Sequence, residues 1–330
     1  MNRLETTDAA EQPMPGLSVV IPVYNSAQSL PPLMERLLRV LESLQLPFEV
    51  ILVNDGSSDE SWEVITQLAV KAPAVRGICL MRNYGQHNAL LAGVRCAQHE
   101  VIVTLDDDLQ HPPEELPKLL EKLRAGFDVV YGWPEQGRHG AFRNFASLIT
   151  KLTLRTTMGA RSAEHVSAFR AFRTDLRRAF ATYQSPFVSL DVLLTWGTAK
   201  FAAVRVRHEE RKFGRSSYTL WKLIRHALNM VTGFSVLPLQ LASIVGFFFS
   251  FAGVVVLAFV LGRFLIYGSV VAGFPFLASI IAIFSGVQLF ALGVLGQYLA
   301  RVHFRAMNRP VYTIRETTSA GTTANMAAPE

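Results

Sequence analysis

The sequence lacks the glycine-rich phosphate-binding motifs of the commonest nucleotide-binding folds. No G-x-G-x-x-G follows the first apolar strand, and no G-x-x-x-x-G-K-S/T occurs anywhere in the 330 residues. A bound nucleotide would therefore depend on a metal ion and on arginines. Cysteine is also scarce, and Cys79 and Cys96 do not have the spacing of metal ligands. We expect both to be small buried hydrophobic side chains and not a redox or thiolate site.

Charge is absent from two long C-terminal stretches, 227–262 and 264–300, which only Arg263 separates. A membrane-spanning helix needs about 20 predominantly apolar residues, and each stretch exceeds that. We predict two transmembrane helices at about 236–262 and 272–300. The alternative is a hydrophobic helical hairpin buried in a soluble core, but such cores seldom contain two uncharged runs of this length.

Basic residues flank the predicted spans and are missing from the segment between them, 267–273. The positive-inside rule therefore places both termini in the cytoplasm and a short hairpin outside, which makes this a multi-pass protein of the cytoplasmic (inner) membrane. The N-terminus is polar and has no apolar signal-peptide core. The net charge of +6 suits an anionic membrane surface, although charge alone does not exclude nucleic acid. The flanking basic residues are Arg211, Lys212, Arg215, Lys222, Arg225, Arg301, Arg305 and Arg309.

Between the disordered ends that we expect at 1–15 and from about 316 onward, residues 16–210 predict one α/β domain. Near-continuous apolar runs indicate strands buried on both faces of a parallel sheet. Amphipathic stretches between them indicate crossover helices, so the expected architecture is an open sheet with helices on both faces. The predicted strands are 17–22, 48–53, 75–80 and 101–105, and the predicted helices are 30–44, 61–70, 86–97 and 114–123.

Polar loops follow all four predicted strands. The carboxyl ends of parallel strands meet at one edge of a sheet, where ligands bind, so these loops predict a shared site. They contain Pro22, Tyr24 and Asn25 after the first strand, Asp55 after the second, Arg82 after the third, and Asp106, Asp107, Asp108 and Gln110 after the fourth.

The acidic loop carries the clearest chemistry. Asp106 and Asp108 lie two residues apart, so their carboxylates can converge on Mg²⁺ or Mn²⁺, with Gln110 as a further oxygen ligand. The alternative is a solvated acidic turn before the helix at 114–123. Asp55 can accept hydrogen bonds from a base or ribose, or can instead cap the helix that follows it.

These motifs resemble a known family. IPVYN (21–25), VNDGSSD (53–59), MRNYGQHNALLAG (81–93) and TLDDDLQHPPEEL (104–116) are similar to the inverting family 2 glycosyltransferases with the GT-A fold. The closer resemblance is to the polyisoprenyl-phosphate glycosyltransferases, which include dolichol-phosphate mannose synthase, bactoprenol glucosyltransferases and undecaprenyl-phosphate 4-deoxy-4-formamido-arabinose transferase. It continues through Arg143-Asn144, Phe169-Arg170, 211–218 and 295–301, and so covers about 17–312.

The resemblance implies roles for individual residues. Asp106, Asp108 and Gln110 would hold a metal, Mg²⁺ or Mn²⁺, on the donor diphosphate. Arg143 and Arg211 would contact donor and acceptor phosphates, for which guanidinium geometry is well suited. Ser217 would also face the acceptor phosphate, where many relatives have lysine. The nucleotide would contact Pro22, Tyr24, Asn25, Asp55, Arg82, Asp106 and Asp107, and the catalytic set would be Asp106, Asp108, Arg143, Arg211 and Asp191.

The expected reaction is inverting transfer of a sugar from a nucleotide-diphosphate donor, UDP-linked by default, to a polyisoprenyl (undecaprenyl) phosphate at the cytoplasmic face. A lipid phosphate is already ionised and needs no general base. Asp191 could act as a base, contact the sugar or cap a helix. Segments 141–154 and 218–230 predict amphipathic helices that lie in the membrane interface. The second of these helices belongs to a predicted linker at 211–235. Alternatives are a lipid hydroxyl acceptor such as diacylglycerol, or a metal-dependent nucleotidyl or phosphoryl transferase. We expect the membrane, not nucleic acid, as partner, with homo-oligomers left open.

Overall fold

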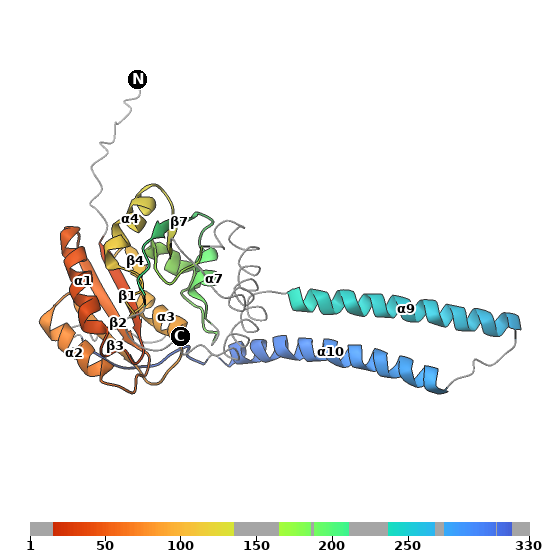
Figure 1. Ribbon diagram of the computed structural model, residues 1–330. Coiled ribbons are helices and arrows are strands. Elements are labelled where there is room, and N and C mark those ends of the chain that lie inside the picture. Colours follow the sequence, from red (N-terminus) through yellow and green to blue (C-terminus); the bar gives the residue numbers. More distant parts are fainter. Residues whose placement is uncertain are drawn as a thin grey trace, which may run out of the picture.

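The computed structural model describes residues 16–134, 165–185, 188–210, 237–267, 274–307 and 309–318. Figure 1 shows a globular α/β domain from which two long helices project side by side. The predicted segments 1–15, 141–154 and 211–235 lie outside the described residues, so the interfacial helices and the N-terminal segment stay predictions.

The domain is built on one eight-stranded sheet in the order β7-β5-β6-β4-β1-β2-β3-β8. All its strands run parallel except β6 and β8, which are antiparallel to their neighbours. The strands are β1 Leu17–Val23, β2 Phe48–Asn54, β3 Val75–Leu80, β4 Val101–Thr104, β5 Val129–Pro134, β6 Arg170–Arg173, β7 Phe201–Val206 and β8 Ile314–Thr317. The four predicted strands are confirmed to within one residue at each end.

Helices cover both faces of the sheet, as predicted. On one face α1 (Leu30–Ser43), α2 (Ser61–Lys71) and α4 (Leu116–Arg124) pack on apolar side chains such as Val19 and Leu52. On the other face α3 (Gln86–Cys96), the 3-10 helix η2 (Thr174–Phe180) and α7 (Leu190–Thr195) pack on Val20 and Val53. Successive residues of β1 therefore serve opposite cores, because strand side chains alternate between faces. The predicted helix at 114–123 begins as a 3-10 turn, η1 (Pro113–Glu115).

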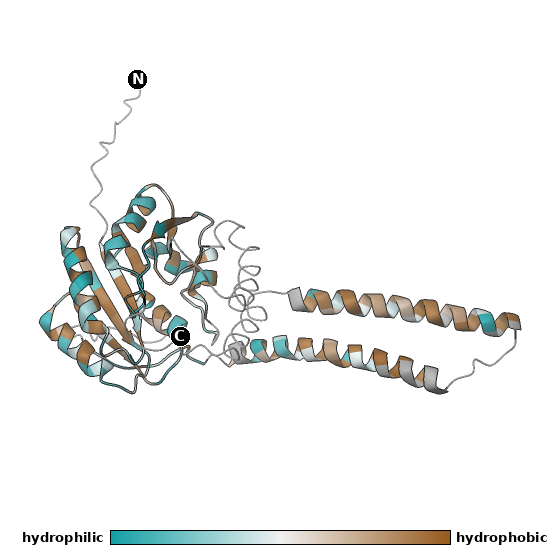
Figure 2. Cartoon of the chain, in the orientation of Figure 1, coloured by the Kyte–Doolittle hydropathy of each residue, from teal (hydrophilic) through white to brown (hydrophobic). Residues whose placement is uncertain are grey.

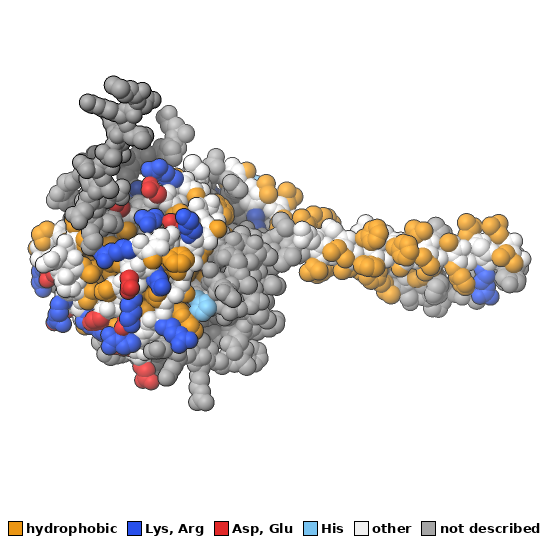
Figure 3. All heavy atoms as spheres, turned by 90° about the horizontal axis from the view of Figure 1, so that it is seen from above, with side chains coloured by type: hydrophobic (Ala, Val, Ile, Leu, Met, Phe, Trp, Pro, Cys, Tyr) orange, Lys and Arg blue, Asp and Glu red, His pale blue; other side chains and the backbone are white. Residues whose placement is uncertain are grey.

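Two apolar helices follow the domain, α9 (Leu237–Tyr267) and α10 (Phe274–Ala306). The stretches Leu239–Arg263 and Ile283–His303 are long and apolar enough to cross a membrane, and their residues are not buried by the rest of the chain. The alternative of a hairpin buried in a soluble core is therefore wrong. Figure 2 shows the largely hydrophobic colouring of both helices, and Figure 3 shows apolar side chains along the hairpin beside the charged surface of the domain. Phe249 and Phe284 pack edge-to-face between the helices, with ring centroids 5.9 Å apart.

The C-terminal tail corrects one prediction. Disorder was expected from about residue 316, but Ile314–Thr317 form β8, which pairs antiparallel with β3. Beyond it, the Thr318 amide donates to the Gly77 carbonyl over 3.0 Å, and the Gly77 amide donates to the Thr318 hydroxyl over 2.7 Å. The local composition is polar and uninformative, and the unpaired edge of β3 supplies the hydrogen bonds that order the segment.

Gly93 makes the close packing of α3 on the sheet possible. A Cβ at this position would lie 2.3 Å from Val20 Cγ1 and 3.1 Å from Val53 Cγ2. Both valines are fully buried and branched at Cβ, so they cannot rotate out of the way. We predict that Gly93→Ala lowers the free energy of unfolding by about 1–3 kcal/mol, the cost of overpacking a core.

Denaturant unfolding of the detergent-solubilised protein measures this loss. The control is Val70→Ala on α2, where the side chain is 82% exposed and a change within about 0.5 kcal/mol is expected. Equal stabilities of the two variants would show that α3 can move off the sheet.

Candidate active site

Asp55 joins the loops that follow β2 and β3. Its carboxylate accepts hydrogen bonds from the backbone amides of Tyr84 and Gly85, over 2.7 and 2.8 Å. Asp55 is only 3% exposed, and burial raises the pKa of its carboxyl while these two amides oppose the shift. Gly85, at φ 95°, adopts a backbone conformation that other residues rarely take, and α3 begins directly after it. Asp55 therefore fixes the loop after β3. The residue that accepts a hydrogen bond at the start of α2 is Asp59, from the Ser61 amide, and not Asp55.

Asn25 joins the loops that follow β1 and β2. Its side-chain oxygen accepts from the Ser58 amide over 2.8 Å, and its own amide donates to the Ser57 hydroxyl over 3.0 Å. Its φ of 54° lies in the left-handed region, which asparagine tolerates better than most residues. Beside it, the Tyr24 side chain is 51% exposed and presents an aromatic face to solvent. Pro22 is buried within β1, so it supports this loop from below.

The acidic loop after β4 contacts both neighbouring loops. The Gln86 side-chain amide, at the start of α3, donates to Asp106 Oδ1 over 2.7 Å. The Tyr24 amide donates to Asp107 Oδ2 over 3.3 Å, and the Gln110 amide donates to Asp108 Oδ1 over 3.1 Å. The prediction that the strand-end loops meet is confirmed. Arg82 joins the same edge, with its guanidinium carbon 4.8 Å from the centre of the Tyr84 ring.

The acidic loop contains a strained backbone position, Leu109, and a partly desolvated carboxylate, Asp107. Leu109 has φ 60° and its side chain is 2% exposed, so core packing offsets a conformation that costs about 1–3 kcal/mol. Burial raises the pKa of Asp107 to about 6, and the neighbouring Asp108 carboxylate adds to the shift. Ionisation of Asp107 is therefore less favourable than that of an exposed aspartate.

The donor atoms of the loop suit a hard divalent cation. Asp106, Asp108 and Gln110 offer only oxygen, as Mg²⁺ and Mn²⁺ prefer. No group of three His, Cys, Asp or Glu side chains able to hold a metal occurs within the described residues. The protein therefore offers a partial ligand set, of the kind that phosphate oxygens and water complete for Mg²⁺.

Arg36 on α1 connects the acidic loop to the segment that follows β7. Its guanidinium bonds to Glu114 over 2.8 and 3.0 Å and to Glu209 over 2.9 and 3.3 Å. These two carboxylates raise the pKa of Arg36, and Arg36 lowers the pKa of Glu114. The Glu209 amide in turn donates to the Gln110 carbonyl over 2.9 Å. Residues 207–210 thus lie along the acidic loop, immediately before the predicted Arg211.

His111 and His208 lie between the acidic loop and β7. Their ring centroids are 5.2 Å apart, and His111 Nε2 lies 3.4 Å from the Ser167 hydroxyl. Burial lowers the pKa of His111 to about 4, with a further contribution from His208. His111 is therefore neutral at pH 7 and adds no positive charge beside the carboxylates.

Asp191 does not cap α7. It is 7% exposed, forms an ion pair with the fully buried Arg170 and accepts a hydrogen bond from the Tyr131 hydroxyl over 3.0 Å. Arg170 also donates to the Thr104 hydroxyl over 3.0 Å. This cluster ties β4, β5, β6 and α7 together, so the carboxylate is committed to a buried network beneath the loops. A catalytic base at this position is disfavoured.

The remaining predicted residues, Arg143, Arg211 and Ser217, lie outside the described residues. Their roles stay predictions. The sequence-based prediction also missed Gln86, Arg36 and the serines at 57 and 58. Gln86 and the serines stand in the quoted motifs, so their proximity to the strand ends was available as a signal. Arg36 had none, because its partners are 78 and 173 residues away in the chain.

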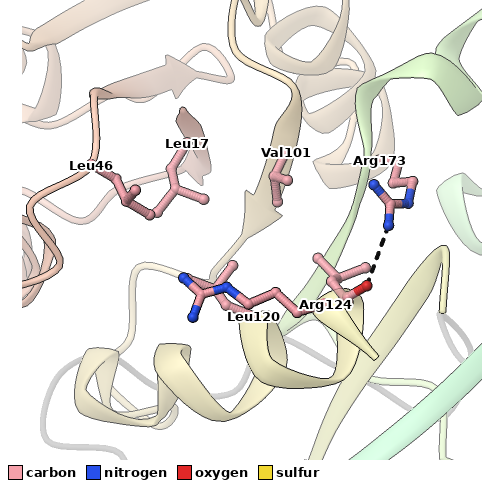
Figure 4. Close-up of a pocket in the computed structure, with 7 residues that line it drawn as sticks. Leu17, Leu46, Val101, Leu120, Arg124 and Arg173 are labelled. Atoms are coloured by element: carbon pink, nitrogen blue, oxygen red, sulfur yellow. Dashed lines mark hydrogen bonds between the residues drawn. The ribbon is translucent and has the colours of Figure 1, made fainter. Parts of the chain in front are cut away.

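A cavity of about 170 Å³ lies at the amino-terminal ends of β1 and β4, opposite the strand-end loops. Its lining includes Leu17 and Val101, the first residues of β1 and β4, so it is separate from the strand-end loops. Figure 4 shows its apolar lining with Arg124 and Arg173 at the border, where Arg173 donates to the Leu123 carbonyl over 3.3 Å.

Replacing the Asp191 carboxylate separates its structural role from a catalytic one. Asp191→Asn leaves the buried Arg170 charge without a counter-ion, so we predict a loss of about 3–5 kcal/mol in unfolding free energy. The control is Asp175→Asn in the exposed Asp175–Arg178 pair, which should cost less than about 1 kcal/mol. An Asp191→Asn variant of unchanged stability would restore the base hypothesis.

A double-mutant cycle measures the contact of Arg36 with Glu209. We expect the single variants Arg36→Gln and Glu209→Gln, with the double variant, to give a coupling energy of about 1 kcal/mol, because the paired side chains are only 23% and 32% exposed. The Arg39–Glu35 pair on the same helix is the control. Its side chains are 70% and 73% exposed, so about 0.3–0.5 kcal/mol is expected. Equal couplings would contradict a special role for Arg36.

Comparison with known proteins gives the family. The model of glycosyl transferase family 2 matches residues 18–183. A protein of Pectobacterium atrosepticum named undecaprenyl-phosphate 4-deoxy-4-formamido-L-arabinose transferase is 35% identical over 309 residues, 93% of this chain and 94% of the relative. Its namesake in Pseudomonas paraeruginosa is 35% identical over 315 residues, 94% and 93% of the two chains.

Among solved structures, glucosyl-3-phosphoglycerate synthase of Mycobacterium tuberculosis matches with a TM-score of 0.48 and 16% identity, covering 66% of this chain and 78% of that one. That structure is a complex with Mn²⁺, UDP and glucosyl-3-phosphoglycerate. The two relatives match almost the whole chain, and the family model covers β1 to η2, including the loops that follow β1, β2, β3 and β4. The chain belongs to glycosyl transferase family 2 and is a glycosyltransferase with the GT-A architecture.

Proposed function

We propose that the protein transfers a sugar, with inversion, from a UDP-linked donor to undecaprenyl phosphate at the cytoplasmic face of the inner membrane. The products are an undecaprenyl-phosphate sugar and UDP. The observation that carries the proposal is a connected set of strand-end loops: Asp55 binds the loop after β3, and Gln86 and Tyr24 bind Asp106 and Asp107 of the acidic loop. The same chain carries an apolar helical hairpin. The named acceptor of the relatives is undecaprenyl phosphate, which agrees with this combination.

The donor would lie across the strand-end loops. Tyr24 offers an exposed ring for the nucleobase, and Asp55 keeps further lone pairs for polar groups of the nucleoside. Asp106, Asp108 and Gln110 would hold Mg²⁺ or Mn²⁺ against the diphosphate. When bound, the metal supplies Lewis-acid stabilisation of the leaving nucleoside diphosphate. Gln86 holds the Asp106 carboxylate at the position from which it would act.

The acceptor needs no general base. A phosphate monoester has a second pKa near 6, so its oxygen is largely ionised at pH 7 and already nucleophilic. The protein's part is alignment and control of charge, for which the predicted Arg143 and Arg211 supply guanidinium groups. The Asp191 ion pair with Arg170 supports this scheme, because it commits the carboxylate that a hydroxyl acceptor would require as a base.

The test is sugar transfer to defined lipids in proteoliposomes. Undecaprenyl phosphate should be labelled by one of a panel containing UDP-hexoses, UDP-4-deoxy-4-formamido-L-arabinose and GDP-mannose. EDTA should abolish labelling and added Mg²⁺ or Mn²⁺ should restore it. Asp106→Asn and Asp108→Asn should each lower kcat/KM by about 100-fold or more, as expected for losing a preorganised electrostatic contact.

Asp175→Asn, on the exposed surface, is the matched acidic control and should retain activity. Release of UDP distinguishes the proposal from a nucleotidyl transferase, which would release pyrophosphate. Labelling of diacylglycerol in preference to undecaprenyl phosphate, or EDTA-resistant transfer, would contradict the proposed function.

A further inference from the structure

The helical hairpin is connected to both outer strands of the sheet. β7 and β8 lie at opposite ends of the strand order. The chain leaves β7 at Val206, reaches α9 at Leu237, and returns from α10 at Ala306 to enter β8 at Ile314. Figure 1 shows the return path passing under the domain to the β3 side, away from β7.

Both connections meet the sheet at the edge that carries the active-site loops. β7 is parallel to β5 and ends beside Pro134, the last residue of that strand. β8 is antiparallel to β3, so its first residue, Ile314, pairs with Leu80 at the end of β3. The two connections to the hairpin therefore lie on either side of the strand-end loops.

Each connection is fastened to an active-site loop. On the β7 side, the Glu209 amide binds the Gln110 carbonyl of the acidic loop. On the β8 side, the Met81 amide donates to the Thr313 carbonyl over 2.9 Å, immediately before the loop of Arg82. Arg315 donates to the Met81 carbonyl over 3.1 Å.

Residues 309–318, here called the C-terminal tether, also pack into the domain. Val311 is 6% exposed within the core of α3 and α7, and the Tyr312 ring lies 5.7 Å from the Arg95 guanidinium carbon. From Ala306 to Val311 is five residues, which span at most about 18 Å when fully extended. This length sets an upper limit on the separation of the β3 edge from the end of α10.

We propose that the C-terminal tether is a positioning element that holds the active-site edge of the sheet close to the end of α10 and so to the bilayer. The consequence for catalysis rests on the proposed function. The phosphate of a lipid acceptor stays at the membrane surface, so the strand-end loops must be held close to that surface. The tether is short, so it limits how far the β3 side of the sheet can move away from the end of α10.

The test inserts a twelve-residue Gly/Ser linker after Arg309, which leaves β8 intact. The insertion lengthens the connection between Ala306 and Val311 from five residues to seventeen. Effective concentration falls roughly as the −3/2 power of linker length, so the concentration of the active site at the bilayer should fall by about sixfold. KM for undecaprenyl phosphate in proteoliposomes should rise by about that factor. Turnover of a short-chain, water-soluble polyisoprenyl phosphate should stay at the wild-type level, as should the thermal unfolding midpoint. The same linker placed after Thr318 is the control and should change nothing.

A second measurement does not depend on activity. A donor fluorophore on Val70→Cys and acceptors on lipid headgroups report the height of the domain in nanodiscs, with Cys79 and Cys96 at least partly shielded from labelling. Energy transfer should change with the linker after Arg309 and not with the linker after Thr318. Two results would overturn the proposed role of the tether. One is identical energy transfer in the two linker variants; the other is an equal loss of sugar transfer to undecaprenyl phosphate and to the water-soluble polyisoprenyl phosphate. If the wild type transfers sugar to neither lipid phosphate while energy transfer still changes with the linker after Arg309, the proposed function fails and the role of the tether stands.

Discussion

Two hydrogen bonds from the Tyr84 and Gly85 amides to the buried Asp55 carboxylate hold the loop after β3 in place, and the rest of the site is arranged around that loop. The loop leads into α3, whose first residue, Gln86, reaches across to Asp106. Loss of the Asp55 contact would therefore release the support of the acidic loop as well. A carboxylate with both oxygens on backbone amides costs desolvation, and its role in fixing two loops explains why it is kept.

Below the loops, a second buried charge performs a different task. Arg170 and Asp191 are paired under the carboxyl ends of β4 and β5, with Tyr131 and Thr104 completing their hydrogen bonds. Such a pair adds little net stability compared with apolar packing, but removal of one partner is costly. This pair is buried beneath the site, whereas Asp106, Asp107 and Asp108 in the loop above it are partly exposed.

The sequence predicted the parts of the fold that depend on local pattern. The strands of continuous apolar residues, the helices on both faces and the two long apolar helices were all recognisable, because burial on both faces of a sheet and in a bilayer leaves little room for charge. It did not predict β8, whose order comes from the edge of β3, nor the contacts of Arg36, whose partners are far away in the chain. For Asp191 the sequence leaves a base, a sugar contact and a helix cap open, since nothing local to it indicates the buried Arg170.

The order of the strands along the chain has a consequence for biosynthesis. Among the described strands, β8 is the last to be synthesised, and it follows both apolar helices. Until it arrives, the hydrogen-bonding edge of β3 is open, which is the condition under which sheets associate with other chains. The eight-stranded sheet is therefore completed only after both apolar helices have been synthesised.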